Sequence, residues 1–274
     1  MNAVIELRGV RKNYGKVEVL KGINMSINKG DIYGLIGQNG AGKTTIFKLI
    51  LGLSDFNNGE ISILNSKDEK EKNKSRSKIG FLIGSNFFTY LSGKGNLEYY
   101  SRLKGCYSKE EIERVLGIVG LDKKAANMAV KKYSLGMKQR LGIANALLGK
   151  PEILILDEPT NGLDPQGILD IRNLIKKLNK EEGITIIVSS HILGELENTA
   201  HRFGIVHKGV IKDELTSDEI LNRTGVTNIE VSDDDVEKAK KVLEENGIEI
   251  KKIAKNDNYL EDFYFGLVNG KEGK

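Results

Sequence analysis

The sequence predicts an α/β fold with two kinds of β-sheet. Continuous apolar runs at residues 32–36 and 153–156 are typical of short strands that are buried on both faces of a parallel sheet. Partly alternating stretches rich in β-branched residues, at 4–7, 19–27 and 60–64, are typical of half-buried strands instead. We therefore expect a buried parallel core with a second sheet beside it.

The second half of the core is predicted to be a β-α-β unit. The strand at 153–156 is followed by a helix from about 164 to 180 and by a strand at 185–189. Parallel strands joined in this way are connected by a right-handed crossover in nearly all proteins. Residues 93–150, which precede this unit, show helical apolar spacing and are expected to form a separate block of helices.

A change in composition near residue 216 predicts two domains, one over 1–215 and a small C-terminal α/β appendage over 216–274. No internal repeat of solenoid length is found in the sequence. The predicted elements of the appendage are a strand at 228–231, a polar helix at 233–246, a strand at 248–253 and an ending at 260–268.

Charge and composition exclude several classes of protein. The net charge is +4, from 42 basic and 38 acidic residues, and this excess is too small to drive nucleic-acid binding by itself. The densest charged stretch, 67–78, has no aromatic residue to stack on a base, so we expect a solvated loop there and no nucleic-acid partner. The one cysteine, Cys106, cannot form an internal disulfide, and no apolar run approaches the roughly 18 residues of a membrane span. We expect a soluble protein of a reducing cytoplasm.

A glycine-rich loop stands between the strand at 32–36 and a helix predicted at 45–51. It fits the pattern G-x-x-x-x-G-K-[ST], in which glycines let backbone N–H groups turn toward anionic oxygens at a positive helix end. The flanking strand and helix are the context that this pattern requires, and a glycine-rich turn that binds nothing is the weaker alternative. The residues expected to hold the triphosphate of ATP are Gly37, Gln38, Asn39, Gly40, Ala41, Gly42, Lys43, Thr44 and Thr45.

Two carboxylates, Asp157 and Glu158, follow the strand at 153–156. They should face the nucleotide, because ligands gather outside the carboxyl ends of parallel strands. Lys43 is expected to reach the β- and γ-phosphates during catalysis, and Thr44 and Asp157 are expected to bind Mg²⁺. Glu158 is then free to orient and deprotonate the water that attacks the γ-phosphate. The alternative is a pair of solvated acids that begin a turn.

A histidine, His191, comes shortly after the strand predicted at 185–189. That strand would lie beside the one that carries Glu158, so His191 could reach the γ-phosphate or the attacking water and join in catalysis. His201 and His207 lack this placement and are expected to be packing or surface residues.

The motif that identifies a family is Tyr133-Ser134-Leu135-Gly136-Met137, followed by Lys138-Gln139-Arg140. Together with the loop and the carboxylates, it resembles the ATP-binding cassette (ABC) family of transporter ATPases over roughly residues 1–215. The motif is similar to the family's L-S-G-G-Q signature, with Leu135 and Met137 in place of a glycine and a glutamine. The resemblance implies a P-loop NTPase core of the ABC ATPase type, with an antiparallel β subdomain and a helical subdomain over about 93–150.

In this family the signature of one subunit completes the nucleotide site of another. The resemblance therefore implies a homodimer in which a second ATP-binding subunit places Ser134 and Gly136 against ATP. A hydroxyl at a helix start also suits an anion on physical grounds, and a plain helix cap at Ser134 is compatible with this role. Tyr14 resembles the aromatic residue that stacks on adenine, the alternative being a packed turn residue. Asp164 ends a loop, 161–164, that is similar to the one carrying signals between the two sites; a helix-capping turn is the alternative.

The variant signature and the short tail resemble the bacterial exporter type that extrudes peptide antibiotics, lantibiotics or sodium. This implies an ATP-hydrolysing subunit in the cytoplasm, peripheral on the inner face of the cell membrane, that drives separate integral membrane permease subunits. Two alternatives stay open. One is a soluble ABC ATPase acting on ribosomes or DNA, and the other is a nucleotide-binding regulator that hydrolyses ATP weakly.

One position departs from the family pattern. Gly84 stands where the family has a glutamine, or in related exporters a glutamate, that touches Mg²⁺ and reports to the membrane subunit. Ser85 or Asn86 could supply an oxygen, but the glycine itself has no side chain for either task. The aromatic-rich residues 87–91 follow at the point where the family docks its membrane partner, and packing in the core is the alternative for them.

Overall fold

The computed structural model describes residues 3–66, 68–84, 87–197 and 199–219, and in the C-terminal part 229, 231–248, 250 and 253. The chain divides into two compact units, Met1–Ile220 and Leu221–Lys274. All residues predicted for the nucleotide site belong to the first unit.

In the second unit, the predicted polar helix is present as a 3-10 turn, η2 (Asp233–Asp235), followed by α10 (Val236–Glu245). Half of the residues in each of the strands predicted at 228–231 and 248–253 lie outside the described residues, and the ending at 260–268 lies wholly outside them.

A six-stranded sheet forms the core of the first unit, as the apolar runs predict. Its spatial order is β5 (Ile79–Leu82), β6 (Ile153–Asp157), β7 (Thr185–Ser190), β3 (Ile32–Ile36), β8 (Arg202–His207) and β9 (Val210–Thr216). All neighbours pair in parallel except β9, which is antiparallel to β8 at the edge. Every residue of β3 and β7 is buried, which explains why strands of a covered parallel sheet show no alternation. Helix α7 (Pro165–Glu182) connects β6 to β7 and completes the predicted β-α-β unit.

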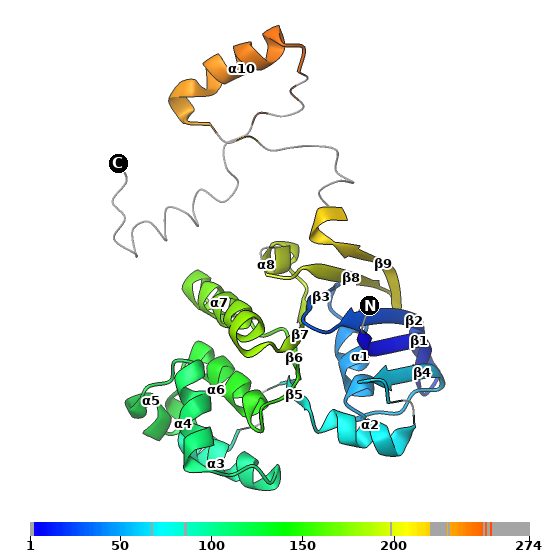
Figure 1. Ribbon diagram of the computed structural model, residues 1–274, viewed down its shortest axis with the longest axis vertical. Coiled ribbons are helices and arrows are strands. Elements are labelled where there is room, and N and C mark those ends of the chain that lie inside the picture. The colour runs from blue at the N-terminus through cyan, green and yellow to red at the C-terminus, as the bar shows by residue number, and fades with distance from the viewer. Residues whose placement is uncertain are drawn as a thin grey trace. The chain divides into compact units, whose positions relative to one another are not determined.

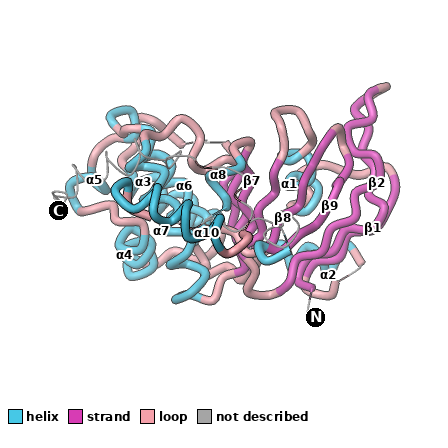
Figure 2. The backbone as a smooth tube through the Cα atoms, turned by 90° about the horizontal axis from the view of Figure 1, so that it is seen from above, coloured by secondary structure: helices cyan, strands magenta, loops and turns pink. Residues whose placement is uncertain are grey.

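A block of helices packs on one face of this sheet, on the side opposite the small antiparallel strands (Figures 1 and 2). One apolar cluster joins Leu97, Ile112 and Leu141 of these helices to Leu154 and Leu156 of β6. The block confirms the helical spacing of residues 93–150. It contains α3 (Gly93–Leu103), α4 (Lys109–Ile118), α5 (Lys123–Asn127), η1 (Val130–Lys132) and α6 (Leu135–Leu147).

The second predicted sheet is antiparallel, with the order β2 (Val17–Asn28), β1 (Ala3–Tyr14) and β4 (Asn58–Ile63). Strands β1 and β2 are longer than predicted, because their outer ends are largely exposed and carry few apolar residues. Helix α1 (Lys43–Ile50) lies between this sheet and the central one. A second apolar cluster contains Ile5 of β1, Phe47 of α1, and Leu35 and Ile155 of the central sheet. The loop that precedes α1 is therefore held from both sides.

Most of the charged stretch at 67–78 is a helix, so the prediction of a solvated loop was wrong. Helix α2 (Glu69–Arg76) is capped by Asp68, whose Oδ1 accepts a hydrogen bond from Glu71 N at 3.0 Å. Lys72 is buried and pairs with Glu69, while its long stem covers apolar surface. The helix has no apolar stripe, and the available signals were its cap, the acidic first turn and the basic last turn. Between β7 and β8 lies the short helix α8 (Leu193–Glu197). None of the helices in the described part of the chain is both long and apolar enough to cross a membrane.

Candidate active site

The glycines of the phosphate loop are required for different reasons. A Cβ at Gly37 would lie 2.5 Å from the carbonyl oxygen of Val206 in β8, too close for any side chain. Gly42 has φ +113° and a Cβ there would lie 2.7 Å from Leu20 Cδ2. Gly40 is left-handed at φ +80°, but a Cβ on it would meet no atom within 4 Å. Gly37 is therefore required by crowding against backbone, Gly42 mainly by its backbone conformation with Leu20 close by, and Gly40 by its backbone conformation alone.

The loop is tied to the strands that flank it. Gly209 N donates to Ala41 O at 3.1 Å, and Gly209 O in turn accepts from Lys21 N at 2.8 Å. Helix α1 begins at Lys43 with Gly42 as its cap, which makes no side-chain hydrogen bond, and the first turn has no acidic residue. The N–H groups of that turn are thus left for an external anion, in a loop whose position is already set.

Lys43 is almost fully buried, with 4% of its surface exposed. Its Nζ donates to Gly37 O at 2.6 Å and to Gln38 O at 3.3 Å, and lies 3.2 Å from Glu158 Oε1. The ammonium group is therefore held at the mouth of the loop by two carbonyls and one carboxylate. A phosphate at the loop would compete with these oxygens for the same charge.

Thr44, Asp157 and Ser189 form a chain of hydroxyl and carboxylate groups. Thr44 Oγ1 donates to Asp157 Oδ2 at 2.6 Å, and Ser189 Oγ donates to Asp157 Oδ1 at 2.6 Å. The backbone N–H of Glu158 donates to the same serine hydroxyl at 2.9 Å. Ser189 was not predicted from the sequence, although a hydroxyl at the carboxyl end of a buried strand was an available signal. It fixes the orientation of Asp157 from the neighbouring strand.

The oxygens of Thr44 and Asp157 suit Mg²⁺, which prefers hard oxygen ligands and commonly takes only one or two carboxylates from a phosphate-binding protein. Within the described ranges, no group of three or more His, Cys, Asp or Glu side chains could hold a metal. A magnesium ion at this site would therefore need phosphate oxygens and water to fill its octahedral shell.

Glu158 is at the centre of the predicted catalytic groups. Its φ is +48°, an uncommon conformation for a residue other than glycine. One carboxylate oxygen faces Lys43, and the other, Oε2, lies 3.2 Å from His191 Nδ1 and accepts from Asn161 Nδ2 at 3.4 Å. The contact between Oε2 and His191 lacks hydrogen-bond geometry. The structure thus brings Lys43, Glu158 and His191 together around one carboxylate.

The signature turn has different surroundings. Ser134 is exposed and caps α6, its Oγ accepting from Met137 N at 3.2 Å. Leu135 Cδ2 would lie 3.1 Å from a Cβ at Gly162, and Leu163 Cδ2 would lie 3.8 Å from one at Gly136. In the described residues no hydrogen bond joins this turn to the phosphate loop. The first turn of α6 therefore packs on the 161–164 loop of its own chain.

Two other predicted positions are partly explained by local structure. Asp164 caps α7 by accepting from Gly167 N at 2.9 Å, with Pro165 in the first helical turn. Tyr14 ends β1 and is 46% exposed, with Lys12 Nζ 4.8 Å from the centre of its ring. Tyr14 is thus not packed inside a turn, and its ring is accessible to a planar partner.

Gly84 is exposed, with φ +65° and no atom within 4 Å of a Cβ built on it. Ser85 and Asn86, considered as substitute oxygen donors, lie outside the described residues. In the aromatic segment that follows, Phe87 packs against the helical core, and Phe88 makes a T-shaped contact with Tyr99. Tyr90 is 71% exposed. One side of this segment therefore packs in the core, as the alternative expects, and the other side faces outward. Docking of a membrane partner there stays a prediction.

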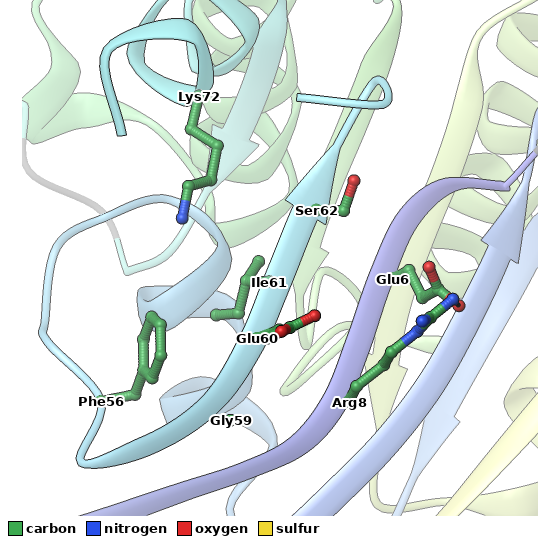
Figure 3. A pocket seen from close by; sticks show the side chains of 8 residues that line it. All are labelled: Glu6, Arg8, Phe56, Gly59, Glu60, Ile61, Ser62 and Lys72. Carbon is green, nitrogen blue, oxygen red and sulfur yellow. Dashed lines mark hydrogen bonds and ion pairs between the residues drawn. The ribbon is translucent and has the colours of Figure 1, made fainter. Parts of the chain in front are cut away.

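A hollow of about 260 Å³ lies elsewhere, on the antiparallel sheet (Figure 3). None of the predicted site residues lines it. Its cations are already paired, Arg8 Nη2 with Glu6 Oε1 at 2.8 Å and Lys72 with Glu69. We assign no ligand to it.

Comparisons with known proteins identify the family of the chain. The family described as ABC transporter matches residues 20–161. The bacitracin transport ATP-binding protein BcrA of Bacillus licheniformis is 37% identical over 98% of this chain and 99% of its own length. The lantibiotic transport ATP-binding protein SrtF of Streptococcus pyogenes is 42% identical over 76% of this chain and 89% of its own. A solved dimer of an ATP-binding cassette, in a post-hydrolysis state bound to ADP and Pi, has a TM-score of 0.70 at 30% identity, covering 78% of this chain and 98% of that one.

Proposed function

We propose that this chain, an ATP-binding ATPase subunit of the ABC transporter family, powers a separate membrane permease. The permease would export a peptide antibiotic of the bacitracin or lantibiotic type. The observation that carries this proposal is the extent of the match to the bacitracin transport protein. A match over 98% of the chain takes in most of Leu221–Lys274, whereas the solved cassette leaves more than a fifth of the chain unmatched. The C-terminal unit is thus shared with a bacitracin transport protein. We take 216–274 to be an appendage to a cassette over 1–215.

The phosphate loop would bind ATP through its backbone N–H groups, with Lys43 at the β- and γ-phosphates. Thr44 and Asp157 would hold Mg²⁺, which would neutralise charge on the phosphates. Glu158 would orient the attacking water and accept its proton, and His191, 3.2 Å from the Glu158 carboxylate, would contact the γ-phosphate or that water. Catalysis here is mainly positioning and electrostatic stabilisation.

The second half of the site would come from another copy of the chain. Ser134 is exposed and has no hydrogen bond to its own phosphate loop within the described ranges, so its hydroxyl and the start of α6 are accessible to the ATP of a partner. The solved relative is a dimer, which supports this arrangement. Two ATP molecules would then close a homodimer because each adheres to both chains, and hydrolysis would release it.

The membrane partner would contact the outward side of the aromatic segment, where Tyr90 and Tyr99 are exposed beside Phe88. The protein would then be peripheral on the cytoplasmic face of the cell membrane. The net charge of +4 supports no nucleic-acid role.

A second candidate function, a regulator with weak hydrolysis, is favoured by Gly84 alone. A side chain there would be strained at φ +65°, so the position does not readily accept the glutamine or glutamate of other family members. Steady-state ATPase activity separates the two candidates. The exporter proposal expects wild type to exceed Glu158→Gln by at least about 100-fold, whereas a regulator expects similar, low rates for both.

The export proposal is tested in a bacitracin-sensitive bacterium that expresses the chain with the membrane protein encoded beside it. We expect tolerance of bacitracin or a lantibiotic to rise, and to disappear with Glu158→Gln. The matched control is Glu181→Gln, an exposed position on α7, which should retain full tolerance. Unchanged sensitivity with the wild-type pair would overturn the proposed substrate class.

A further inference from the structure

Glu195, on α8, is a buried carboxylate to which no role has been assigned above. It is 7% exposed, and ionised side chains are rarely buried to this extent without partners. Its Oε2 accepts two hydrogen bonds, from Thr160 Oγ1 at 2.7 Å and from Ser190 Oγ at 2.8 Å. Both hydroxyls are themselves buried. The three side chains form one hydrogen-bonded network with Glu195 at its centre.

The two hydroxyls belong to the turns that carry the predicted catalytic groups. Thr160 lies in the turn after Glu158, which is closed by Asn161 N donating to Glu158 O at 3.2 Å. Ser190 directly precedes His191, and its Oγ also accepts from Ile192 N at 2.9 Å, which closes a small turn around the histidine. Through one carboxylate oxygen, the network therefore ties the turn of Glu158 to the turn of His191.

The two turns need such support. Glu158 has a left-handed backbone, a conformation that costs of order 1 kcal/mol or more and persists only where its surroundings hold it. His191 approaches Glu158 Oε2 to 3.2 Å without a hydrogen bond between them. Their separation is consequently set by the backbone behind them rather than by their own contact.

We propose that Glu195 is a positioning residue for ATP hydrolysis: by accepting from Thr160 and Ser190, it fixes Glu158 and His191 at the separation that hydrolysis requires. This rests on the catalytic roles proposed for those two residues. Glu195 does not touch the reacting groups. Its loss should lower turnover without lowering the affinity for ATP, since neither turn belongs to the phosphate loop.

The test compares kcat, KM for ATP and the thermal midpoint of Glu195→Ala, Glu195→Gln and wild type. Alanine leaves the buried Thr160 hydroxyl without its acceptor and leaves the Ser190 hydroxyl with only the longer hydrogen bond to Ile192 O at 3.2 Å. We expect kcat to fall about 10-fold or more while KM changes less than about threefold. Glutamine keeps an amide oxygen that accepts one of the hydrogen bonds, and should recover a substantial part of the lost turnover. The matched control is Glu197→Ala, an exposed glutamate on the same helix, which should leave kcat unchanged.

If Glu195→Ala does not fold, Thr160→Val and Ser190→Ala each remove one arm of the network and should each lower kcat by a smaller factor at unchanged KM. A kcat unaltered in every variant that folds, measured well below its thermal midpoint, would overturn the proposal. So would a loss of ATP affinity as large as the loss of kcat. Glu158→Gln is assayed in parallel to separate the proposed function from the positioning role of Glu195. Full activity of Glu158→Gln would contradict the proposed function. An inactive Glu158→Gln beside a fully active Glu195→Ala would contradict only the positioning role.

Discussion

The phosphate loop and the signature turn are both helix starts with an anion-binding character, but they differ in how far this chain completes them. At the loop, Lys43 is buried, and Thr44 is hydrogen-bonded to a carboxylate on β6. At the signature turn, Ser134 is exposed and bonds only its own helix among the hydrogen bonds of the described residues. One half of a nucleotide site is thus built into the fold, and the other half is presented on the surface. We therefore expect one chain to be sufficient for ATP binding and two chains to be required for ATP hydrolysis.

The largest effect is expected at the phosphate loop. Lys43→Ala removes the cation that faces the phosphates and leaves Glu158 without its ion pair, so ATP affinity should fall by about 100-fold or more. The control is Lys48→Ala, an exposed lysine in the last turn of α1, which should bind normally. Equilibrium binding of a fluorescent ATP analogue gives the measurement, and equal affinity in both variants would contradict the assigned role of Lys43.

The next largest effect is expected at the signature turn. Gly136→Asp places a carboxylate where the partner's phosphates would lie, and the fold has room for it, since a Cβ there is 3.8 Å from Leu163. We expect at least about a 10-fold loss of ATPase activity with unchanged affinity for ATP in a single chain. Gly117→Asp in α4, where a Cβ meets no atom within 4 Å, is the control. If Gly136→Asp hydrolyses ATP at the wild-type rate, the signature turn does not complete a second site.

A smaller effect is expected at the contact between the signature turn and the 161–164 loop. Gly162→Ala adds a Cβ at φ +76° and 3.1 Å from Leu135 Cδ2, so the free energy of unfolding should fall by about 1 kcal/mol or more. Part of this cost is crowding. The double variant Gly162→Ala/Leu135→Ala should therefore be more stable than the sum of the single changes predicts, by about 0.5 kcal/mol in denaturant unfolding. Strict additivity would mean that Leu135 does not bear on the loop.

The smallest effect concerns the far end of α6, which anchors the signature helix. Arg114 donates to both oxygens of Glu111 at 2.8 Å and to Leu147 O at 3.1 Å. The hydrogen bonds from Arg114 lower the pKa of Glu111 below its ordinary value. The pair therefore contributes stability above the pKa of the unfolded chain, about 4.3, and loses it as pH falls through the lower folded-state value. Glu111→Gln should cost about 1 kcal/mol at pH ~7 in urea unfolding and progressively less at acidic pH; a cost that does not change with pH would exclude the charge as its cause.

The fold could be predicted largely because its signals are local. A buried parallel strand has a continuous apolar run, and the phosphate loop has a fixed spacing. The strands β3 and β6 and the positions of Lys43 and Asp157 at their ends could therefore be predicted from the sequence. Helix α2 did not, because it is held by a cap and by charge pairing rather than by an apolar face.

The groups that support the site were hidden for a different reason. Ser189 and Glu195 matter only because parallel pairing brings the ends of β6 and β7 side by side, and no spacing in the sequence encodes which hydroxyl meets which carboxylate. Likewise, the contact of Leu135 with Gly162 joins residues of two different segments. Side-chain partners across strands are a property of the folded chain, not of a motif.

We infer that each ATP molecule contacts the phosphate loop of one chain and the signature turn of another. The direct measurement is sedimentation velocity of Glu158→Gln, which should retain bound ATP, with and without Mg²⁺-ATP. We expect a monomer without nucleotide, a dimer with saturating ATP, and a monomer under both conditions when Gly136→Asp is added. A Glu158→Gln chain that stays monomeric at saturating ATP, or a dimer that Gly136→Asp leaves intact, would contradict the shared site.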